Sequence, residues 1–157
     1  NEGLDSGYEG DYKDEVECIE AAKAVYALAL NESLSRYGQD IGTEQVIIEN
    51  LANILIYCYV SDSTVSRVMQ NKDFYDSKGE VVPELCAKVY TAEQGIRVME
   101  YANKIFNSIF DSEIPADIEQ KLDVLKKRLS LKTDTIGLKK IIGEKVVEAG
   151  GYPVKSF

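Results

Sequence analysis

The segment PELCAKVYTAEQGIRVMEYANKIFNSIF, from Pro83 to Phe110, carries an apolar or small side chain every three or four positions. Side chains at this spacing lie on one face of an α-helix, so the segment is predicted to form one long amphipathic helix. Pro83 suits the first turn, where no backbone N–H is required. A helix of this length must bury its apolar face against other elements. The predicted face consists of Leu85, Val89, Ala92, Ile96, Met99, Asn103, Phe106 and Phe110.

Two more long helices are predicted before this one. The first runs from Asp11 to Gly38; its opening turns are acidic, as a helix N-terminus prefers, and Gly38 suits its C-terminal end. The second begins after Thr43, which we assign as its N-cap, and continues to Met69. The face of the first comprises Val16, Ile19, Ala22, Tyr26, Ala29, Leu30, Ser33 and Tyr37. The face of the second comprises Ile47, Leu51, Ile54, Leu55, Cys58, Asp62, Val65 and Met69.

The remaining segments are shorter. Residues 71–82 lose the helical period and are predicted to form a loop. Ile114-Pro115 opens a fourth helix, Ala116 to about Leu131, whose face is Ile118, Leu122, Leu125 and Leu129. A fifth helix begins at Thr133 or Asp134 and ends at Gly150-Gly151. No segment alternates as a strand does. The predicted fold class is all-α, an up-and-down helical bundle of three long and two shorter helices.

Composition limits the function. A chain of 157 residues and 17.5 kDa predicts one domain, with 1–10 as a linker and 11–157 as the helical domain. A net charge of -9 disfavours nucleic-acid binding, and the lack of histidine removes the usual imidazole base and His-containing metal sites. No apolar run is long enough to span a membrane, and the cysteines, Cys18, Cys58 and Cys86, are predicted to be reduced packing residues. These features favour a cytoplasmic protein, and the Gly- and Asp-rich start without methionine favours a piece of a larger one.

One polar cluster on the second helix is a candidate site. Asp62, with Glu49, Asn53 and Arg67 nearby, would lie on or beside the buried face. A functional interpretation makes Asp62 a base or a carboxylate ligand. We favour a structural one, in which Asp62 is hydrogen-bonded to a neighbouring helix or paired with an arginine such as Arg97, because no histidine or second carboxylate completes an acid–base pair or a metal site.

Basic residues flank the loop that joins the fourth and fifth helices. Two interpretations are open: an amphipathic face for an anionic membrane, or a solvated face whose cations complement the end of that helix. The second interpretation is favoured, since this basic segment contains neither the Trp nor the Phe that membrane-surface helices usually carry. Its charged residues are Lys126, Lys127, Arg128, Lys132, Lys139 and Lys140. Gly137, Gly143 and Gly150-Gly151 have no phosphate-loop spacing and are predicted to serve close helix packing and a C-cap.

The tail TDTIGLKKIIGEKVVEAGGYP, Thr133 to Pro153, resembles the last helix of acyl-CoA dehydrogenases of the very-long-chain type. Two earlier segments resemble the second and third helices of the same C-terminal domain, in the same order. They are ENLANILIYCYVSDSTVSR, Glu49 to Arg67, and the segment from Leu85 to Phe110. The resemblance implies a homodimeric FAD enzyme that oxidises acyl-CoA in fatty acid β-oxidation, with this domain covering its catalytic body. The glutamate base of that family belongs to an earlier motif. Tyr8-Glu9-Gly10-Asp11 shares only its Tyr-Glu-Gly, and is not assigned this role.

The leading hypothesis is therefore a non-catalytic C-terminal domain of an FAD-dependent acyl-CoA dehydrogenase. No catalytic, cofactor-binding or metal-ligating residue is predicted in this chain, and FAD and acyl-CoA are expected to bind elsewhere in the parent enzyme. The partner is the catalytic body of the same polypeptide, and peripheral membrane contact is not favoured. The alternative is a stand-alone helical module for protein–protein interaction. A weaker third hypothesis is a bundle that binds a small ligand between the second and third helices.

Overall fold

The computed structural model describes residues 8–154, which contain helices and no strand. The all-α fold class is confirmed. The three predicted long helices and both shorter ones are present, and two short elements join them. The elements are α1 (Lys13–Tyr37), the 3₁₀ helix η1 (Gly38–Thr43), α2 (Gln45–Gln70), α3 (Lys72–Lys78), α4 (Val82–Ile109), α5 (Ala116–Leu129) and α6 (Thr135–Ala149). Residues 1–7 of the predicted linker lie outside the described residues.

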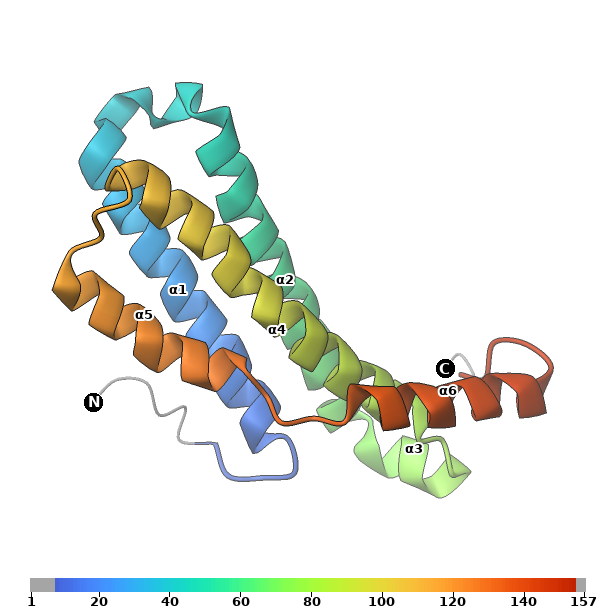
Figure 1. The fold of residues 1–157 in the computed structure, drawn as a ribbon. Helices are drawn as coiled ribbons and strands as arrows, with labels where there is room; N and C mark the ends of the chain where they lie inside the picture. The colour runs from blue at the N-terminus through green and yellow to red at the C-terminus, as the bar shows by residue number, and fades with distance from the viewer. Residues whose placement is uncertain (1–7, 155–157) are drawn as a thin grey trace.

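Helices α1, α2, α4 and α5 run alternately up and down side by side (Figure 1). The three long helices pack against one another, and α5 lies along α1 and α4. Helix α6 packs mainly against α4 and runs across the bundle instead of along it (Figure 1). The bundle therefore has a four-helix core, and the tail helix is an appendage on one side of it.

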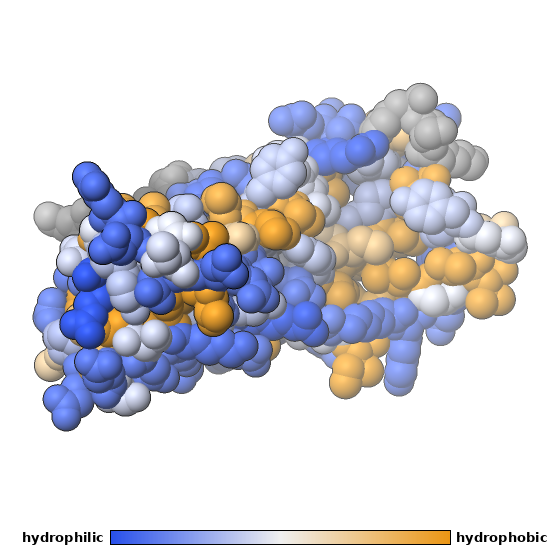
Figure 2. Space-filling model, turned by 90° about the horizontal axis from the view of Figure 1, so that it is seen from above, coloured by the Kyte–Doolittle hydropathy of each residue, from blue (hydrophilic) through white to orange (hydrophobic). Residues whose placement is uncertain are grey.

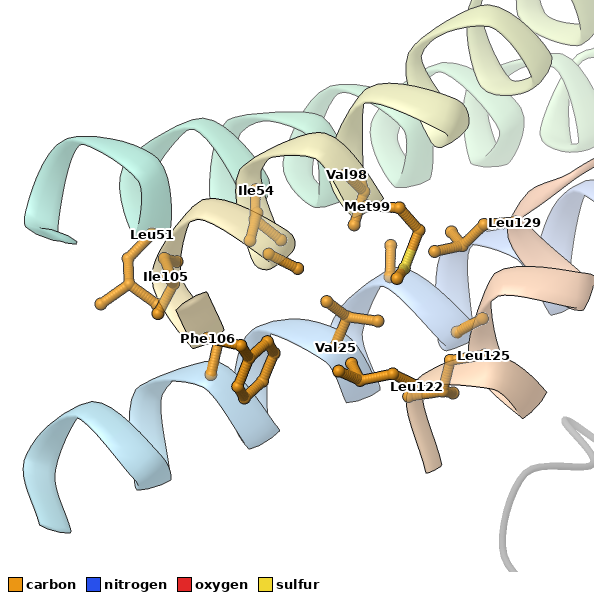
Figure 3. Close-up of a cluster of buried hydrophobic side chains, with 14 of the residues drawn as sticks. Val25, Leu51, Ile54, Val98, Met99, Ile105, Phe106, Leu122, Leu125 and Leu129 are labelled. Carbon is orange, nitrogen blue, oxygen red and sulfur yellow. The ribbon is translucent and has the colours of Figure 1, made fainter. Parts of the chain in front are cut away.

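The core fills the space between these four helices (Figure 3). Val25 of α1, Ile54 of α2, Phe106 of α4 and Leu125 of α5 all belong to one buried cluster. Complete burial of a side chain as large as Phe106 contributes about 2–3 kcal/mol to folding. The α1 side of the core is rich in alanine, which lets neighbouring helices approach closely. All four apolar positions predicted for α5 are buried, which confirms that face; they are Ile118, Leu122, Leu125 and Leu129.

The predicted face of α4 is partly wrong. Ile96 and Asn103 are exposed, whereas Gly95, Val98 and Ile105 are buried. The physical reason is the position of α4, which contacts α1, α2, α5 and α6. A helix with neighbours on several sides buries a wide arc, and the row of residues chosen from the spacing lies near one edge of that arc. Small residues such as Gly95 mark the closest contacts better than the large apolar ones do.

Two predictions about the connections are also wrong. Residues 71–82 are not all loop, because α3 forms there, buries Tyr75 and ends at Gly79 in the left-handed conformation (φ 65°). Thr43 does not cap α2. Its hydroxyl instead donates a hydrogen bond to the carbonyl of Asp40 at 2.8 Å within η1, and Glu44 occupies the N-cap position without a side-chain bond.

The ends of the other helices agree with the prediction. Gly38 ends α1 with a positive φ of 55°, and Gly150 ends α6 in the left-handed conformation, both of which glycine adopts without strain. Asp134 caps α6, accepting a hydrogen bond from the backbone N–H of Gly137 at 3.0 Å. Helix α5 ends at Leu129, two residues before the predicted Leu131.

Candidate interaction surfaces

Asp62 lies on the surface and not on the buried face predicted for it. Its side chain is 52% exposed and accepts a hydrogen bond from Lys23 of α1 at 3.0 Å. The buried position on this turn of α2 is taken by Ser61, because the buried stripe runs from Cys58 through Ser61 to Val65. The predicted hydrogen bond between Asp62 and a neighbouring helix is therefore present, with Lys23 of α1 as its partner in place of an arginine such as Arg97.

Lys23 is shared between two carboxylates. Its ammonium group lies 2.8 Å from Glu20 and 3.0 Å from Asp62, so it links α1 to α2 at the surface. Partial burial alone would lower the pKa of Lys23, but the hydrogen bonds to these two carboxylates outweigh it and raise the pKa. The group remains charged at neutral pH. An arrangement of this kind joins two helices and offers no group poised for proton transfer.

The other polar residues near Asp62 do not gather into a site. Glu49 and Arg67 are exposed and Asn53 is half-buried on α2. Arg97 is exposed on α4 near Glu93, whose pKa is lowered mainly by the hydrogen bond from Lys139 and to a smaller extent by the charge of Arg97. Within residues 8–154, no group of three or more cysteine and carboxylate side chains is placed to hold a metal ion.

A chain of buried polar contacts crosses the three long helices, and no pattern in the sequence predicts it. The thiol of Cys18 on α1 lies 3.4 Å from the hydroxyl of Tyr57 on α2, and that hydroxyl donates to the carbonyl of Thr91 on α4 at 3.2 Å. Burial raises the pKa of Cys18 to about 11 and raises that of Tyr57 further still. Both groups are therefore protonated at neutral pH, so this chain of contacts is suited to holding helices in register.

Gly95 provides the space for this polar chain. A Cβ atom added to Gly95 would lie 3.0 Å from the carbonyl oxygen of Leu129, 3.1 Å from the Cys18 thiol and 3.3 Å from the Tyr57 hydroxyl. Close packing of this kind was predicted instead for Gly137 and Gly143. Gly137 adjoins the Asp134 carboxylate that caps α6, but Gly143 is exposed with open space around it, so the prediction for Gly143 is wrong.

The cysteines differ in their surroundings. Cys18 and Cys58 are buried, as predicted for packing residues, and burial raises the pKa of Cys58 to about 11. Cys86 lies exposed at the start of α4, so its assignment as a packing residue is wrong. All three are free thiols. Cys86 lies on the outward side of these turns of α4, whereas the neighbouring Ala87 is buried in a cluster with Tyr12 and Val65.

The predicted basic segment is divided between two helices. Lys126, Lys127 and Arg128 form the last turn of α5, where cations complement the helix dipole, as the favoured interpretation expects. Lys139 belongs to α6 and donates a hydrogen bond to Glu93 of α4 at 2.7 Å. One of the six cations is thus engaged in fixing α6 to the bundle. None of the helices within residues 8–154 is both long and apolar enough to cross a bilayer.

The apolar face of α6 is left open. None of its residues is buried, and Ile136 and Val147 are 70% and 81% exposed. They lie three turns apart on the same side of the helix, away from the side that carries half-buried Leu138 and Ile142. Figure 2 shows hydrophobic side chains at the surface toward the right of the view, the part of the molecule where Figure 1 draws α6. A helix with this pattern is typical of one that packs against a further surface.

A protein-family model described as the C-terminal domain of acyl-CoA dehydrogenases matches residues 21–127, more than half of the chain. The chain belongs to this family. The match runs from the first third of α1 to near the end of α5, so it covers the four-helix core. Helix α6, the open appendage of this acyl-CoA dehydrogenase C-terminal domain, lies outside the matched residues. A comparison with curated proteins finds no match.

Proposed function

We propose that this chain is the non-catalytic C-terminal domain of an FAD-dependent acyl-CoA dehydrogenase of the very-long-chain type, and that it packs against the catalytic body and stabilises it. The observation that carries the proposal is the family membership of the four-helix core. The very-long-chain assignment rests on three segments that resemble helices of that type of enzyme. They are residues 49–67, 85–110 and 133–153. The parent enzyme would act in fatty acid β-oxidation as a cytoplasmic homodimer.

Two features of the side chains support the proposal that this domain is non-catalytic. The chain has no histidine, and the buried thiols of Cys18 and Cys58 are held in their protonated form by burial. The space between α2 and α4, which the small-ligand hypothesis requires as a binding site, contains the side chains of Ile54 and Val98 (Figure 3). We therefore assign FAD and acyl-CoA binding to the rest of the parent enzyme.

Helix α6 is the element that we assign to the contact with the catalytic body. Its outward side presents Ile136 and Val147, while Lys139 and Glu93 hold its other side to α4. Covering two large aliphatic side chains would remove about 100 to 200 Å² of apolar surface from water, which favours association by a few kcal/mol. The domain would stabilise the body by binding only its folded state.

The test uses the parent enzyme with the double substitution Ile136→Asp and Val147→Asp. We expect flavin to be released at a temperature several degrees lower, with the flavin spectrum at room temperature unchanged. The matched control is Val46→Asp, because Val46 of α2 is comparably exposed at 69% and lies on another helix. The same double substitution in the isolated chain should leave its unfolding temperature unaltered, since both side chains are already solvated. An unchanged flavin-release temperature in the parent enzyme would refute the assignment of α6.

The stand-alone interaction module is the second candidate, and the same open face of α6 favours it. The two functions differ in what α6 binds. If the purified chain captures another protein through Ile136 and Val147, and the source cells hold no larger flavoprotein with this sequence, the interaction module is the better account. Capture that requires the catalytic body supports the dehydrogenase domain.

A further inference from the structure

Helix α6 is held to the bundle by few contacts. The residues that it half-buries all lie in its first half, and every residue from 143 to 149 is exposed. The half-buried residues are Thr135, Gly137, Leu138 and Ile142. In the bundle itself, contacts between helices use fully buried side chains such as Ile54 and Val98. An element with few buried apolar contacts opens at a lower free energy than the core beside it.

An open crevice separates the second half of α6 from the bundle. Its volume is about 300 Å³, and it lies between Lys145, Glu148 and Ala149 of α6 and residues 78–83, where α3 ends and α4 begins. The charged side chains of Lys78 and Glu80 line the opposite wall. The space is open to solvent, so this half of α6 contributes little to holding the helix in place.

One ion pair joins the first half of α6 to α4. The ammonium group of Lys139 lies 2.6 Å and 2.7 Å from the two carboxylate oxygens of Glu93. The hydrogen bond from Lys139 is the main cause of the lowered pKa of Glu93, and one from Thr135 on the same helix adds to it. The side chains of Lys139 and Glu93 are 53% and 36% exposed. Pairs as accessible as this one are individually weak.

The contacts that stabilise α6 internally do not involve the bundle. Asp134 caps the helix by accepting a hydrogen bond from the N–H of Gly137 at 3.0 Å. Lys145 pairs with Glu148 at 2.8 Å, and both residues belong to α6. Each contact joins residues of the same segment, so both are kept when the helix moves as a whole.

The connection between α5 and α6 permits such a movement. Residues 130–134 form no helix (Figure 1). Leu131 packs against the main core cluster, which fixes the chain at that position. Lys132, the next residue, is exposed. Rotation about the backbone between Lys132 and Asp134 would carry α6 away from α4 and leave the four-helix core intact.

We propose that α6 is a reversibly docked arm, joined to α4 by Glu93 and Lys139, that leaves α4 as one unit while the four-helix core stays folded. Undocking uncovers Leu138 and Ile142, which α6 half-buries in the docked state. The docking equilibrium therefore determines how much apolar surface α6 presents. The movement takes place within this chain and requires neither FAD nor the catalytic body, so its test is separate from that of the proposed function.

Hydrogen exchange of the 157-residue chain, followed by NMR, tests the movement. We expect the amides of residues 139–149 to exchange together, at least about a hundredfold faster than those around Val98 on α4. The reason is that an undocked helix of 15 residues protects its amides poorly. Equal protection of α6 and α4 would overturn the proposal.

A truncation on the docked side distinguishes undocking from fraying of the helix end. Leu138→Ala should raise the exchange rates of all α6 amides about tenfold, with those of α4 unchanged, because it removes apolar contact with the bundle. Ile136→Ala is the matched control on the outward side, where the side chain is 70% exposed, and it should not raise these rates. An effect of Leu138→Ala confined to neighbouring amides would mean local fraying and would overturn the movement as a unit.

The ion pair is tested by removing its charges. Glu93→Gln and Lys139→Gln should each raise the α6 exchange rates roughly two- to fivefold. The two substitutions combined should have no larger effect than either alone, because both remove the same contact. Lys140→Gln is the control, since it removes the same charge from the exposed neighbouring residue and should leave the rates unchanged. Additive effects at positions 93 and 139, or an equal effect of Lys140→Gln, would overturn the role given to the pair.

Discussion

The thiol of Cys18 and the hydroxyl of Tyr57 lie 3.4 Å apart in the centre of the bundle, although 39 positions separate them in the chain. Tyr57 also reaches the carbonyl of Thr91, so one side chain contacts all three long helices. These are directional contacts between helices in a core that is mostly apolar. They define how far each helix is shifted along its neighbours.

Replacing Tyr57 by phenylalanine tests this contact. Tyr57→Phe keeps the ring and removes only the hydroxyl, so we expect a loss of about 1 kcal/mol in the free energy of unfolding. Urea denaturation of the chain measures it. Tyr59→Phe is the control, because Tyr59 is exposed on the same helix, and its stability should not change. Equal stability of the Tyr57 and Tyr59 variants would contradict the role given to the buried hydroxyl.

Gly95 should tolerate no larger residue. Gly95→Ala would place a methyl group within 3.0 to 3.3 Å of three atoms, one of which is backbone, so we expect a destabilisation of about 1–3 kcal/mol. Gly143→Ala is the matched control. Gly143 lies inside α6 with open space around it, so alanine there should favour the helix by roughly 0.5–1 kcal/mol. Thermal unfolding of both variants measures the opposite signs, and a stabilised Gly95→Ala variant would show that the packing is looser than described.

The connection between α4 and α5 contains backbone strain. Asp111 and Ser112 both have positive φ, 50° and 67°, a region that costs most residues about 1–2 kcal/mol. Ser112→Gly should therefore stabilise the chain by about 1 kcal/mol, as measured by urea denaturation. Ser108→Gly, on the exposed side of the last turns of α4, should instead destabilise it by roughly 0.5–1 kcal/mol. Destabilisation by both substitutions would argue against the strained turn.

Glu15 makes stability depend on pH. Burial raises its pKa above the ordinary value of 4.5, although the nearby Lys88 opposes the shift. The folded state therefore binds this proton more tightly than the unfolded state does. The contribution of Glu15 favours folding below pH 4.5 and is lost as the pH rises through the raised pKa.

Glu15→Gln should accordingly stabilise the chain at pH 7 relative to the original, and the difference should shrink when both are measured below pH 4.5. Glu17→Gln is a control, since Glu17 lies near the surface beside Lys13. Denaturation at a series of pH values gives the comparison. A destabilised Glu15→Gln variant at neutral pH would mean that the carboxylate is needed in its charged form.

The three thiols should react at very different rates with an aromatic disulfide reagent. Cys86 is exposed, while Cys18 and Cys58 are buried and have pKa values of about 11. We expect Cys86 to react first and the other two at least about a hundredfold more slowly, after local or global unfolding. Cys86→Ser should abolish the fast phase. A fast phase that persists in this variant would show that the core opens readily.

The sequence was sufficient for the class of fold and for most helix boundaries, because spacings of three and four residues report directly on helical faces. The α5 face was predicted in full, since α5 covers the bundle from one side only. The α4 face was not, because α4 has neighbours on several sides. The buried position predicted for Asp62 belongs to Ser61, one residue earlier. A shift of one residue turns a helical side chain by about 100° around the helix axis.

The spacing of residues along the sequence does not predict contacts that form only when several helices pack together. Nothing in the residues around Cys18, Tyr57 and Thr91 indicates that they meet. The reason for a glycine at position 95 becomes apparent only from the neighbouring atoms of α1, α2 and α5, which leave no room for a Cβ atom. Similarly, Leu55 belongs to the apolar face predicted for the second helix, and only the packing shows that it remains exposed.

The most direct measurement is to capture the native protein from its source cells with an antibody against this domain, and then to record its mass and visible absorption. The proposed function predicts a protein much heavier than 17.5 kDa with the absorption spectrum of a bound flavin. A colourless protein of about 17.5 kDa would contradict it.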